Sequence, residues 1–347
     1  MKLIWGILML VFPLLLYGQQ ESYDPGSRFT IAFYNTEDLF DTHNDPETHD
    51  DSYTPYGKKH WTTKRYHKKI DRIGRVLTSL NSYEYPEIIG LAEVENRRVL
   101  KDLVRSARLS DVYYGIVHEN SPDTRGIDVA MLYRPDEFHY LRHQSIPIIF
   151  PFDRESKVRD ILHITGIALD KDTLDIFINH WKSRSDGEIK TQPKRIYSAK
   201  VLKKHIDSLF HHKTHPNIVV IGDFNDEPDD KSLAQVLGAK CINRDVEGKE
   251  LYNLLCEEDR EGRGTYNYKN KWYMLDHFIV SSALLDDEKL TINRQQVKIF
   301  DPPWVMYKNA KAGTKVPNRT YGGNNYFGGY SDHLAIYGIF NFKSSNP

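Results

Sequence analysis

The stretch IVVIGDFND, residues 218–226, joins four apolar β-branched residues to a polar end that carries Asp223 and Asn225. A short apolar run of this composition, followed by turn-forming residues, predicts a buried β-strand. Because side chains alternate along an extended chain, Asp223 and Asn225 are expected to project to one side where this strand ends. An apolar core does not favour a carboxylate and an amide at that place, so the pattern indicates a functional site.

Three other apolar runs end in the same way. They are residues 31–35, which end at Asn35, residues 88–93, which end at Glu93, and residues 176–180, which end at His180. Asp, Asn and Gly are also ordinary turn formers, so any one of these ends has a purely structural explanation. Together, the four strand ends predict that distant segments bring polar groups to one place.

The rest of the sequence predicts strands and helices in a mixed order. Further β-rich runs cover residues 29–34, 127–133, 162–168, 174–178 and 272–280, and helical patterns surround Ile70 and extend from Ile196 to Leu209. Because helices do not follow every strand, the order favours two sheets flanked by helices over a strictly alternating parallel fold. The chain has no Pro/Gly/Ser linker and no fixed repeat, so we expect residues 19–347 to form one layered α/β domain.

The composition sets limits on function. Hydrophobic residues make up 39% of the chain, which is ample for a globular core. The 47 basic and 48 acidic side chains nearly cancel, so no overall positive field draws the protein toward nucleic acid. Any site for a polyanion must therefore be local.

The N-terminus resembles an export signal. Lys2 precedes an apolar run over residues 3–16, and Gly18 offers a small residue for signal peptidase. The run is shorter than the roughly 20 residues that span a bilayer. We therefore expect a signal peptide at residues 1–18 and a secreted or periplasmic mature chain without stable membrane insertion; the alternative is an uncleaved anchor.

The chain has two cysteines, Cys241 and Cys256. Two cysteines exclude a zinc site built from cysteine alone and a disulfide-dense scaffold. One disulfide in an oxidising compartment and two unpaired cysteines both remain open.

The polar groups at the strand ends suit a hard cation. Carboxylates such as Glu93, Asp223 and Asp332, with the amides of Asn35 and Asn225, are oxygen ligands of the kind that Mg²⁺ or Mn²⁺ prefers. The alternative is that these carboxylates form ordinary surface pairs with Lys and Arg.

Two Asp-His dipeptides follow apolar runs, Asp276-His277 and Asp332-His333. A catalytic imidazole usually needs a carboxylate that orients it. We expect Asp276 to orient a distant histidine and His277 to be structural.

Several basic residues are candidates for phosphate binding. Arg125, with Asp128 on the same face, and Lys182 and Arg184 after His180 could meet an anion, although a structural Arg-Asp pair and a solvated loop explain them equally well. A basic cluster could track a nucleic-acid backbone or form the exposed face of a helix; its members are Lys58, Lys59, Lys64, Arg65, Lys68, Lys69 and Arg72. The acidic loop with His43, Asp45, His49, Asp50 and Asp51 could hold a structural cation or be a solvated loop.

Seven short motifs follow one another along the chain in the order typical of a known family. They are Phe33-Tyr34-Asn35, Leu91-Ala92-Glu93, Arg125-Gly126-Ile127-Asp128-Val129-Ala130, Asn179-His180, Gly222-Asp223-Phe224-Asn225, Leu275-Asp276-His277 and Ser331-Asp332-His333. Over nearly the whole mature chain, this series resembles the endonuclease/exonuclease/phosphatase superfamily, which includes deoxyribonuclease I, abasic-site endonucleases, bacterial sphingomyelinases and inositol-polyphosphate phosphatases.

The resemblance implies a four-layer αββα sandwich with the site at one edge of two packed sheets. It implies that Glu93 is the principal ligand of Mg²⁺ or Mn²⁺, supported by Asn35 and Asp332. It also implies that Asp223 activates the attacking water and that Asn225 and His180 hold the phosphoryl oxygens. Asp276 would support His333, which would stabilise the transition state.

The motifs leave the substrate open. The long loops before Trp61 and Ser331 resemble those of secreted bacterial relatives described as nucleases, so a monomeric exported nuclease acting on DNA or RNA is the first hypothesis. The second is a phosphatase or phospholipase-type hydrolase acting on inositol phosphates or phospholipid headgroups. A binding protein without activity is the third, and it is disfavoured because every position that the mechanism requires carries a competent side chain.

Overall fold

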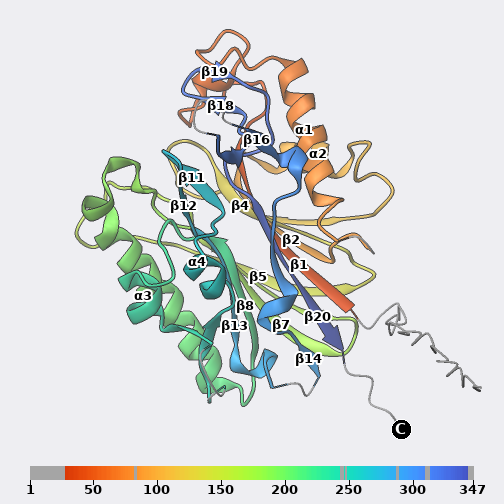
Figure 1. Cartoon of the computed structure of the whole chain (residues 1–347), viewed down its shortest axis with the longest axis vertical. Coiled ribbons are helices and arrows are strands. Elements are labelled where there is room, and N and C mark those ends of the chain that lie inside the picture. The colour runs from red at the N-terminus through yellow and green to blue at the C-terminus, as the bar shows by residue number, and fades with distance from the viewer. Residues whose placement is uncertain are drawn as a thin grey trace, which may run out of the picture.

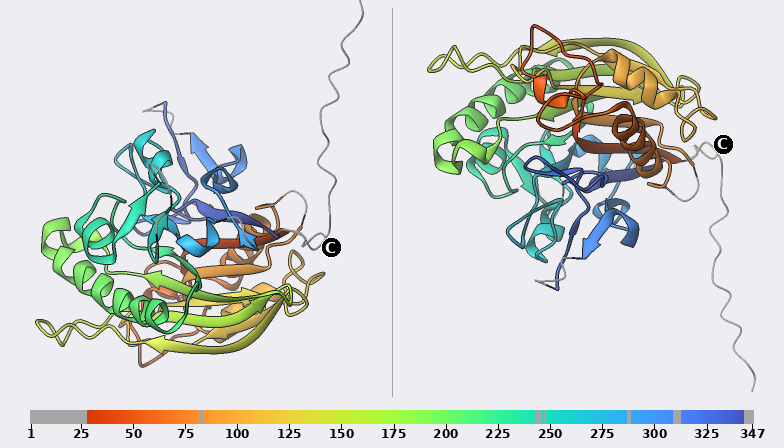
Figure 2. Two further views of the ribbon diagram at one scale, coloured as in Figure 1. Left: turned by 90° about the horizontal axis from the view of Figure 1, so that it is seen from below. Right: turned by 90° about the horizontal axis from the view of Figure 1, so that it is seen from above.

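The computed structural model describes residues 28–81, 84–242, 246, 248–286, 289–308 and 313–342. Two β-sheets pack face to face, and helices cover their outer faces (Figure 1). The predicted αββα sandwich is therefore confirmed. The two sheets and the helix layers are seen edge-on in Figure 2.

The first sheet has the strand order β14-β20-β1-β2-β4-β3, with β15 also paired to β20. Its strands are β1 (Arg28–Leu39), β2 (Ile88–Val94), β3 (Gly115–His118), β4 (Asp128–Tyr133), β14 (Leu290–Thr291), β15 (Val297–Phe300) and β20 (Ala335–Phe342). β1 runs parallel to β2 and antiparallel to β20. Segments from both ends of the described chain thus lie side by side inside this sheet.

The second sheet has the strand order β5-β6-β7-β8-β13-β10-β9. Its strands are β5 (Phe138–Ile146), β6 (Ile161–Ala168), β7 (Asp172–His180), β8 (Asn217–Asp223), β9 (Ala239–Cys241), β10 (Leu251–Asn253) and β13 (Asp276–Ser281). β7 and β8 are parallel, and β13 is antiparallel to β8.

Helices and short hairpins complete the fold. The α-helices are α1 (Thr63–Leu77), α2 (Arg97–Val104), α3 (Glu188–His212) and α4 (Cys256–Arg260). The shorter helical segments are η1 (Asp51–Tyr53), η2 (Arg184–Asp186), η3 (Lys231–Leu237), η4 (Ser282–Leu284), η5 (Arg294–Gln296) and η6 (Pro303–Val305). Three two-stranded hairpins pair β11 (Tyr266–Tyr268) with β12 (Lys271–Tyr273), β16 (Met306–Lys308) with β17 (Lys315–Pro317), and β18 (Tyr321–Gly322) with β19 (Asn325–Tyr326).

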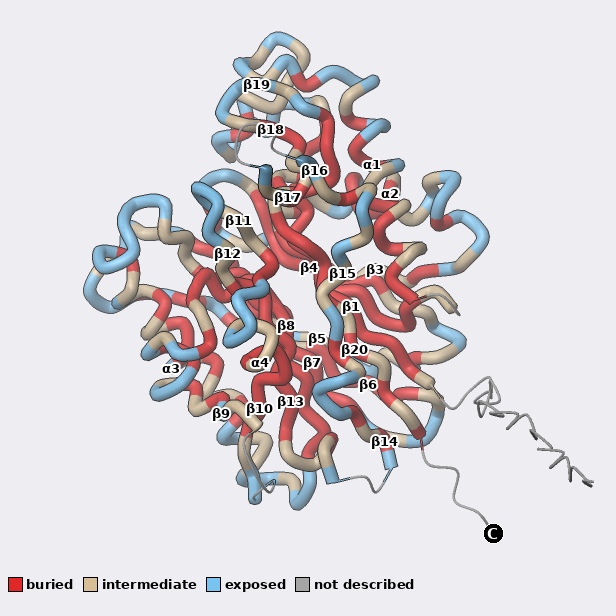
Figure 3. Tube along the Cα trace, in the orientation of Figure 1, coloured by how far each residue is buried: buried red, intermediate tan, exposed pale blue. Residues whose placement is uncertain are grey.

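Strand alternation divides the apolar residues into three layers. In β8, Val219 and Ile221 face the other sheet, whereas Ile218 and Val220 face α3. In β1, Phe33 faces inward and Tyr34 faces α1 and α2. The central strands β1, β2, β7 and β8 are buried along most of their length (Figure 3). A residue's position in its strand therefore determines which layer it joins.

Some predicted boundaries were wrong. The run at residues 272–280 is two strands, because β12 pairs with β11 in a hairpin whereas β13 pairs with β8 in the second sheet. The helical pattern around Ile70 ends at Leu77, so Leu80 lies beyond α1, although it is buried in the same cluster. The predicted signal peptide at residues 1–18 lies outside the described residues. Within the described ranges, no helix combines the length and apolar character that a membrane crossing requires.

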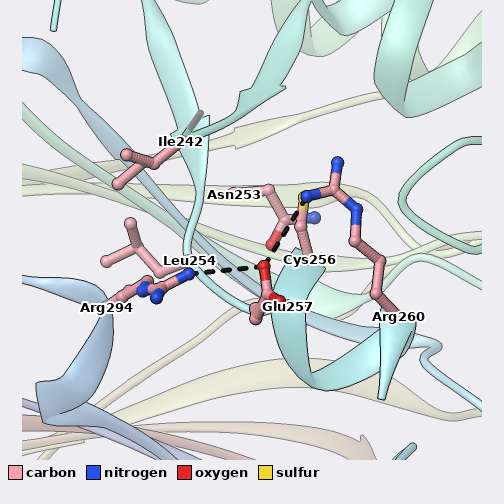
Figure 4. Close-up of a pocket in the computed structure, with 7 residues that line it drawn as sticks. All are labelled: Ile242, Asn253, Leu254, Cys256, Glu257, Arg260 and Arg294. Carbon is pink, nitrogen blue, oxygen red and sulfur yellow. Dashed lines mark hydrogen bonds and ion pairs between the residues drawn. The ribbon is translucent and has the colours of Figure 1, made fainter. Parts of the chain in front are cut away.

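The two cysteines form a disulfide, Cys241–Cys256, which settles the question that the sequence left open. It joins β9 to the start of α4. A small pocket beside it is lined by Asn253, Cys256 and neighbouring residues, and two arginines at its rim pair with Glu257 (Figure 4).

Candidate active site

Three strands of the second sheet place three polar residues in one row. In the strand register, Asp223 lies opposite His180 of β7 on one side and Asp276 of β13 on the other. All three have the same parity as the residues that face the first sheet, such as Ile221. Where the strands end, the apolar inner layer is thus replaced by a row of two carboxylates and an imidazole.

Gly222 allows the strands that carry this row to approach closely. A Cβ atom at Gly222 would lie 2.3 Å from the backbone oxygen of Asn179. A side chain at residue 222 would therefore push β7 and β8 apart. The glycine of the GDFN motif thus fixes the spacing between His180 and Asp223.

Asn35 and Glu93 of the first sheet extend toward this row of the second sheet. Asn35 extends from β1, and its Nδ2 donates to Asp223 Oδ2 at 3.0 Å. Glu93 lies at a break in the register between β2 and β4, since Ala92 pairs with Val129 and Val94 pairs with Asp128. Its φ is 59°, a left-handed conformation that is uncommon for a residue with a side chain. This bulge aims Glu93 at the second sheet.

Asp223 lies at the centre of the group. Its Oδ1 accepts from the backbone N–H of Asn225 at 2.9 Å. Its Oδ2 lies 3.5 Å from His180 Nε2 and 3.8 Å from His333 Nε2. Glu93 Oε1 lies 3.7 Å from His180 Nε2. Residues from both sheets therefore meet within a few ångströms, as the strand-end pattern predicted.

His333 is oriented by the partner that the sequence predicted. Its Nδ1 lies 2.7 Å from Asp276 Oδ2, and because a carboxylate accepts, Nδ1 carries the proton. The turn before it is fixed by Ser331, whose hydroxyl donates to Asn35 O at 2.7 Å and accepts from His333 N at 3.1 Å. The free edge of the ring, Nε2, therefore faces Asp223.

Burial raises the pKa values of two carboxylates in the site, Glu93 and Asp223. Burial raises the pKa of Glu93 to about 8, with further contributions from the nearby charges of Asp38 and Asp332. Burial also raises the pKa of Asp223 to about 6, against the opposing effect of His333. Such shifts are typical of groups that exchange protons or bind cations.

The two site histidines differ in charge. Burial lowers the pKa of His180 well below its ordinary value, and Arg159 and Arg125 add to this effect. Burial also lowers the pKa of His333, but Asp276 and Asp223 outweigh it and raise that pKa well above the ordinary value. His180 is therefore neutral near pH 7, whereas His333 is protonated.

The donor set fits a divalent cation. In the described part of the chain, one group of three His, Asp or Glu side chains has ligand atoms within 4.8 Å of one another, formed by Asp223, Asp276 and His333. The predicted ligands Glu93 and Asp332 lie outside that group. However, Asp276 is engaged with His333, whereas the buried Glu93 is destabilised by neighbouring carboxylates, so a cation is best accommodated beside Glu93. The roles of Asn35, Glu93 and Asp332 as metal ligands stay predictions.

Asn225 is held by the backbone. Its φ is 52°, and its Nδ2 donates to Trp181 O at 3.2 Å. The residue is buried, and its backbone N–H donates to Asp223 Oδ1. Its predicted contact with a phosphoryl oxygen stays a prediction, and one of its N–H groups is already used by Trp181.

The three predicted phosphate-binding residues differ in availability. Arg125 is exposed, lies 3.5 Å from Asp123, and feels the charges of Glu93 and Asp38. Lys182 pairs with Asp186 at 2.8 Å. Arg125 therefore has the side chain best placed to meet a ligand. The alternative of a structural Arg-Asp pair is met by Asp123 and not by Asp128.

Asp128 is engaged elsewhere, since it binds His118 and Ser121. Arg184 belongs to an ion-pair network: its Nε donates to Asn225 O, and its Nη2 pairs with Asp226 and Asp230. Because these acceptors hold its guanidinium, Arg184 would have to leave them to bind phosphate. This arrangement supports the structural explanation of Arg184.

The basic cluster around α1 is largely a structural surface. The Arg65 guanidinium lies over the ring of Tyr326 at 4.2 Å, and that of Arg72 lies over Tyr330 at 4.9 Å. Lys69 is buried, so its inclusion in an exposed nucleic-acid patch was wrong. These cations hold the segment before His333 against α1.

The acidic loop is held by hydrogen bonds. Asp41 pairs with Arg98 at 3.2 Å and accepts from His43 N. Asp50 accepts from Asp45 N at 3.0 Å. Asp41 and Asp50 are buried, so the loop is not simply solvated, and the structural cation stays a prediction.

Three residues near the site, Glu37, Asp38 and Arg319, were missed at the sequence level, and a fourth, Lys69, was assigned to the basic cluster. Glu37 and Asp38 follow Asn35 at φ values of 52° and 56°, and Asp38 N donates to Glu93 Oε2 at 3.0 Å. Lys69 and Arg319 come from α1 and from the loop before Ser331 and approach Glu37. Only the position of Glu37 and Asp38 directly after Asn35 could have indicated them.

Comparison with known proteins identifies the family. The model of the family described as "Endonuclease/Exonuclease/phosphatase family" matches residues 30–341. The chain belongs to the endonuclease/exonuclease/phosphatase family. Members of this family are metal-dependent hydrolases of phosphate esters and diesters. Comparison with curated protein sequences finds no match.

Solved structures of this family share the fold. A mannosyl-6-phosphatase from Bacteroides thetaiotaomicron is 16% identical with a TM-score of 0.55, covering 90% of this chain and 100% of that one. A humanized TDP2 from D. rerio is 15% identical with a TM-score of 0.53, covering 90% and 99%. The human Nocturnin catalytic domain is 14% identical with a TM-score of 0.51, covering 91% and 95%. At these identities the likeness concerns the fold alone.

Proposed function

We propose that this protein is an exported phosphodiesterase that hydrolyses nucleic acid with the help of Mg²⁺ or Mn²⁺. The observation that carries the proposal is the convergence of Glu93, His180, Asp223 and the Asp276–His333 pair between two sheets. Each contributes a group that hydrolysis of a phosphodiester needs.

Asp223 activates the water. Its pKa of about 6 makes it a stronger base than an exposed carboxylate, yet it is ionised near pH 7. Asn35 and the Asn225 backbone N–H hold its two oxygens. A water that donates to Asp223 is thereby oriented and partly deprotonated as it attacks phosphorus.

His333 supplies positive charge and a proton. Asp276 fixes the ring through Nδ1, so Nε2–H points to the side where Asp223 lies. As charge develops on the phosphoryl and leaving oxygens, a preorganised imidazolium stabilises it. His180, neutral and held between Glu93 and Asp223, contributes an N–H to a phosphoryl oxygen.

A divalent cation would be held by Glu93, with Asn35 and Asp332 in support. When bound, it supplies charge stabilisation to the phosphoryl oxygens. The clustered carboxylates Glu93, Asp38 and Asp332 favour this, because their mutual repulsion is relieved by a positive ion.

The nuclease assignment is tested by a substrate panel. The purified protein is assayed with Mg²⁺ or Mn²⁺ on plasmid DNA, RNA, sphingomyelin, inositol phosphates and bis(p-nitrophenyl) phosphate. We expect cleavage of DNA or RNA that a chelator and His333→Ala both abolish. Activity confined to monoesters or lipids would replace the nuclease by a phosphatase or lipid hydrolase. Plasmid nicking that survives the substitution and the chelator would refute the mechanism.

Export is supported by two independent features. The apolar run at residues 3–16 has the length of a signal peptide, and Cys241–Cys256 is a disulfide, which persists in oxidising compartments. Fractionation of cells that express the full chain, followed by N-terminal sequencing, should find a protein that begins near Gln19 outside the cytoplasm. An unprocessed cytoplasmic chain with two free thiols would contradict export.

A further inference from the structure

Arg319 lies at the rim of the site, and the mechanism above gives it no task. Its Nη2 is 2.7 Å from Asp332 Oδ2, and its Nε is 3.6 Å from Glu37 Oε1. The side chain is 40% exposed. Within the described part of the chain, Nη1 has no hydrogen-bond partner. One edge of the guanidinium is therefore anchored, and another is open to a ligand.

Buried groups hold the loop that follows this arginine. Lys69, fully buried in α1, donates from Nζ to Thr320 Oγ1 at 2.5 Å and to Tyr330 O at 2.6 Å. Glu37 lies 4.0 Å from Lys69 Nζ and accepts from the backbone N–H groups of Thr320 and Tyr321. Burying a lysine and a glutamate is costly unless both are satisfied. Here their hydrogen bonds fix the loop that presents Arg319.

A glycine closes the same loop. Gly329 N donates to Arg319 O at 3.1 Å, and a Cβ atom at Gly329 would lie 2.3 Å from that oxygen. The two arms of the loop between Asn318 and Tyr330 can therefore approach only because residue 329 lacks a side chain. Such construction is more than a solvated surface arginine requires.

The surroundings of Arg319 suit an anion. A guanidinium presents parallel N–H donors that match two oxygens of one phosphate. Tyr266 borders the same side of the site: its ring lies 4.9 Å from that of His333, and Arg319 opposes the rise of its pKa caused by burial and Asp332. A substrate chain that leaves the reacting phosphate past His333 would meet Tyr266 and Arg319.

We propose that Arg319 binds a second phosphate of the substrate, adjacent to the one that is hydrolysed, and so selects polynucleotides over isolated phosphodiesters. The inference rests on the proposed phosphodiesterase function. Arg319 contacts Asp332 and Glu37, whereas the reacting groups Asp223, His180 and Glu93 lie among other partners. Arg319 is thus a specificity residue at the rim.

Chromogenic substrates that differ by one phosphate test this proposal. One pair is the p-nitrophenyl ester of thymidine 5′-phosphate with and without a 3′-phosphate; the other is the ester of thymidine 3′-phosphate with and without a 5′-phosphate. In one pair, we expect the second phosphate to raise kcat/KM by about 10- to 100-fold, mainly through KM. Arg319→Gln should abolish this preference and leave the rate on the substrate with one phosphate within about three-fold.

Two further variants sharpen the result. Arg319→Lys keeps the charge but not the fork, so it should retain only part of the preference. Arg294→Gln is the matched control, because Arg294 pairs with Glu257 beside the disulfide pocket. It should behave as the wild type. An equal loss on both members of a pair in Arg319→Gln would show that Arg319 acts only through Asp332 and would overturn the proposal, as would a wild type without preference in either pair.

A binding measurement separates this inference from the proposed function. Calorimetric titration with thymidine 3′,5′-bisphosphate and with each thymidine monophosphate, in Mg²⁺, needs no turnover. We expect the wild type to bind the bisphosphate at least about 10-fold more tightly and Arg319→Gln to lose that difference. Absence of hydrolysis on every diester would refute the proposed function, whereas equal binding of bisphosphate and monophosphates would refute the second-phosphate site.

Discussion

The chain contains the same dipeptide twice, Asp276-His277 and Asp332-His333, and the structure uses the two in opposite ways. His333 faces the site and is held by Asp276. His277 faces away: its Nδ1 accepts from Asn253 and its Nε2 donates to Asp226 O at 2.8 Å. Burial lowers the pKa of His277 to about 4, whereas the pKa of His333 lies well above its ordinary value.

The difference arises because successive side chains of a strand point to opposite faces of the sheet. In β13, Asp276 and Phe278 share the inner face, so His277 must point to the outer face. His333 precedes β20 in a turn, so it is free to approach the inner face together with Asp332. A dipeptide alone does not define a catalytic unit, because neighbouring residues of a strand serve different layers.

The largest expected effect separates the two histidines directly. His333→Ala should lower kcat/KM on bis(p-nitrophenyl) phosphate by about 10³-fold, because it removes the group that stabilises the leaving and phosphoryl oxygens. His277→Gln should stay within about three-fold of the wild type. Steady-state kinetics with Mg²⁺ measures both, and similar losses in the two variants would break the comparison.

The second effect concerns the carboxylate of the first dipeptide. Asp276→Asn should lower kcat by about 10²-fold, since the amide keeps the shape but no longer holds His333 protonated. Because the pKa of His333 falls, the basic limb of the pH–rate profile should move to lower pH. A variant with reduced activity and an unchanged profile would assign Asp276 a purely structural role.

The third effect is on stability and acts through His277. Its pKa is about 4 in the folded protein and about 6.5 when unfolded, so the unfolded chain binds the extra proton first. Folding stability should therefore fall as pH falls from about 6.5 toward 4, with His277 accounting for about 2.5 kcal/mol at pH 4.5. Denaturant unfolding of the wild type and of His277→Gln at pH 7 and pH 4.5 should show a smaller loss in the variant. Equal losses would mean that other groups dominate.

The smallest effect is the loss of the hydrogen bonds of His277. At pH 7.5, His277→Gln should lower the free energy of unfolding by about 1.5 kcal/mol, because buried partners such as the Asp226 carbonyl oxygen lose a well-placed donor. Thermal unfolding at pH 7.5 checks this. A destabilised variant with normal kinetics would confirm that the two dipeptides serve structure and chemistry separately.

Local pattern was enough to predict the layers and much of the site. Apolar runs with polar ends located Asn35, Glu93, His180 and Asp223. This was possible because a few consecutive residues show both the alternation of a strand and the point where it ends. The need of an imidazole for a carboxylate predicted that Asp276 orients a distant histidine, and the family resemblance implied that this histidine is His333, 57 positions away.

Contacts that depend on loops could not be predicted in this way. Lys69 belongs to a basic helix face in the sequence, and its burial depends on Tyr330, which is 261 residues away. Arg184 was a candidate for phosphate binding because its partners Asp226 and Asp230 follow it only after the whole of α3 and β8. Glu37 and Asp38 adopt a left-handed backbone conformation, which cannot be predicted from these residue types.

The place of β20 has a consequence for synthesis. This strand and His333 are among the last described residues, yet β20 pairs with β1 in the middle of the first sheet. A nascent polypeptide that has left the ribosome only as far as residue 330 contains Glu93, His180 and Asp223 but neither β20 nor the His333 imidazole. The proposed site is therefore complete only after His333 has emerged.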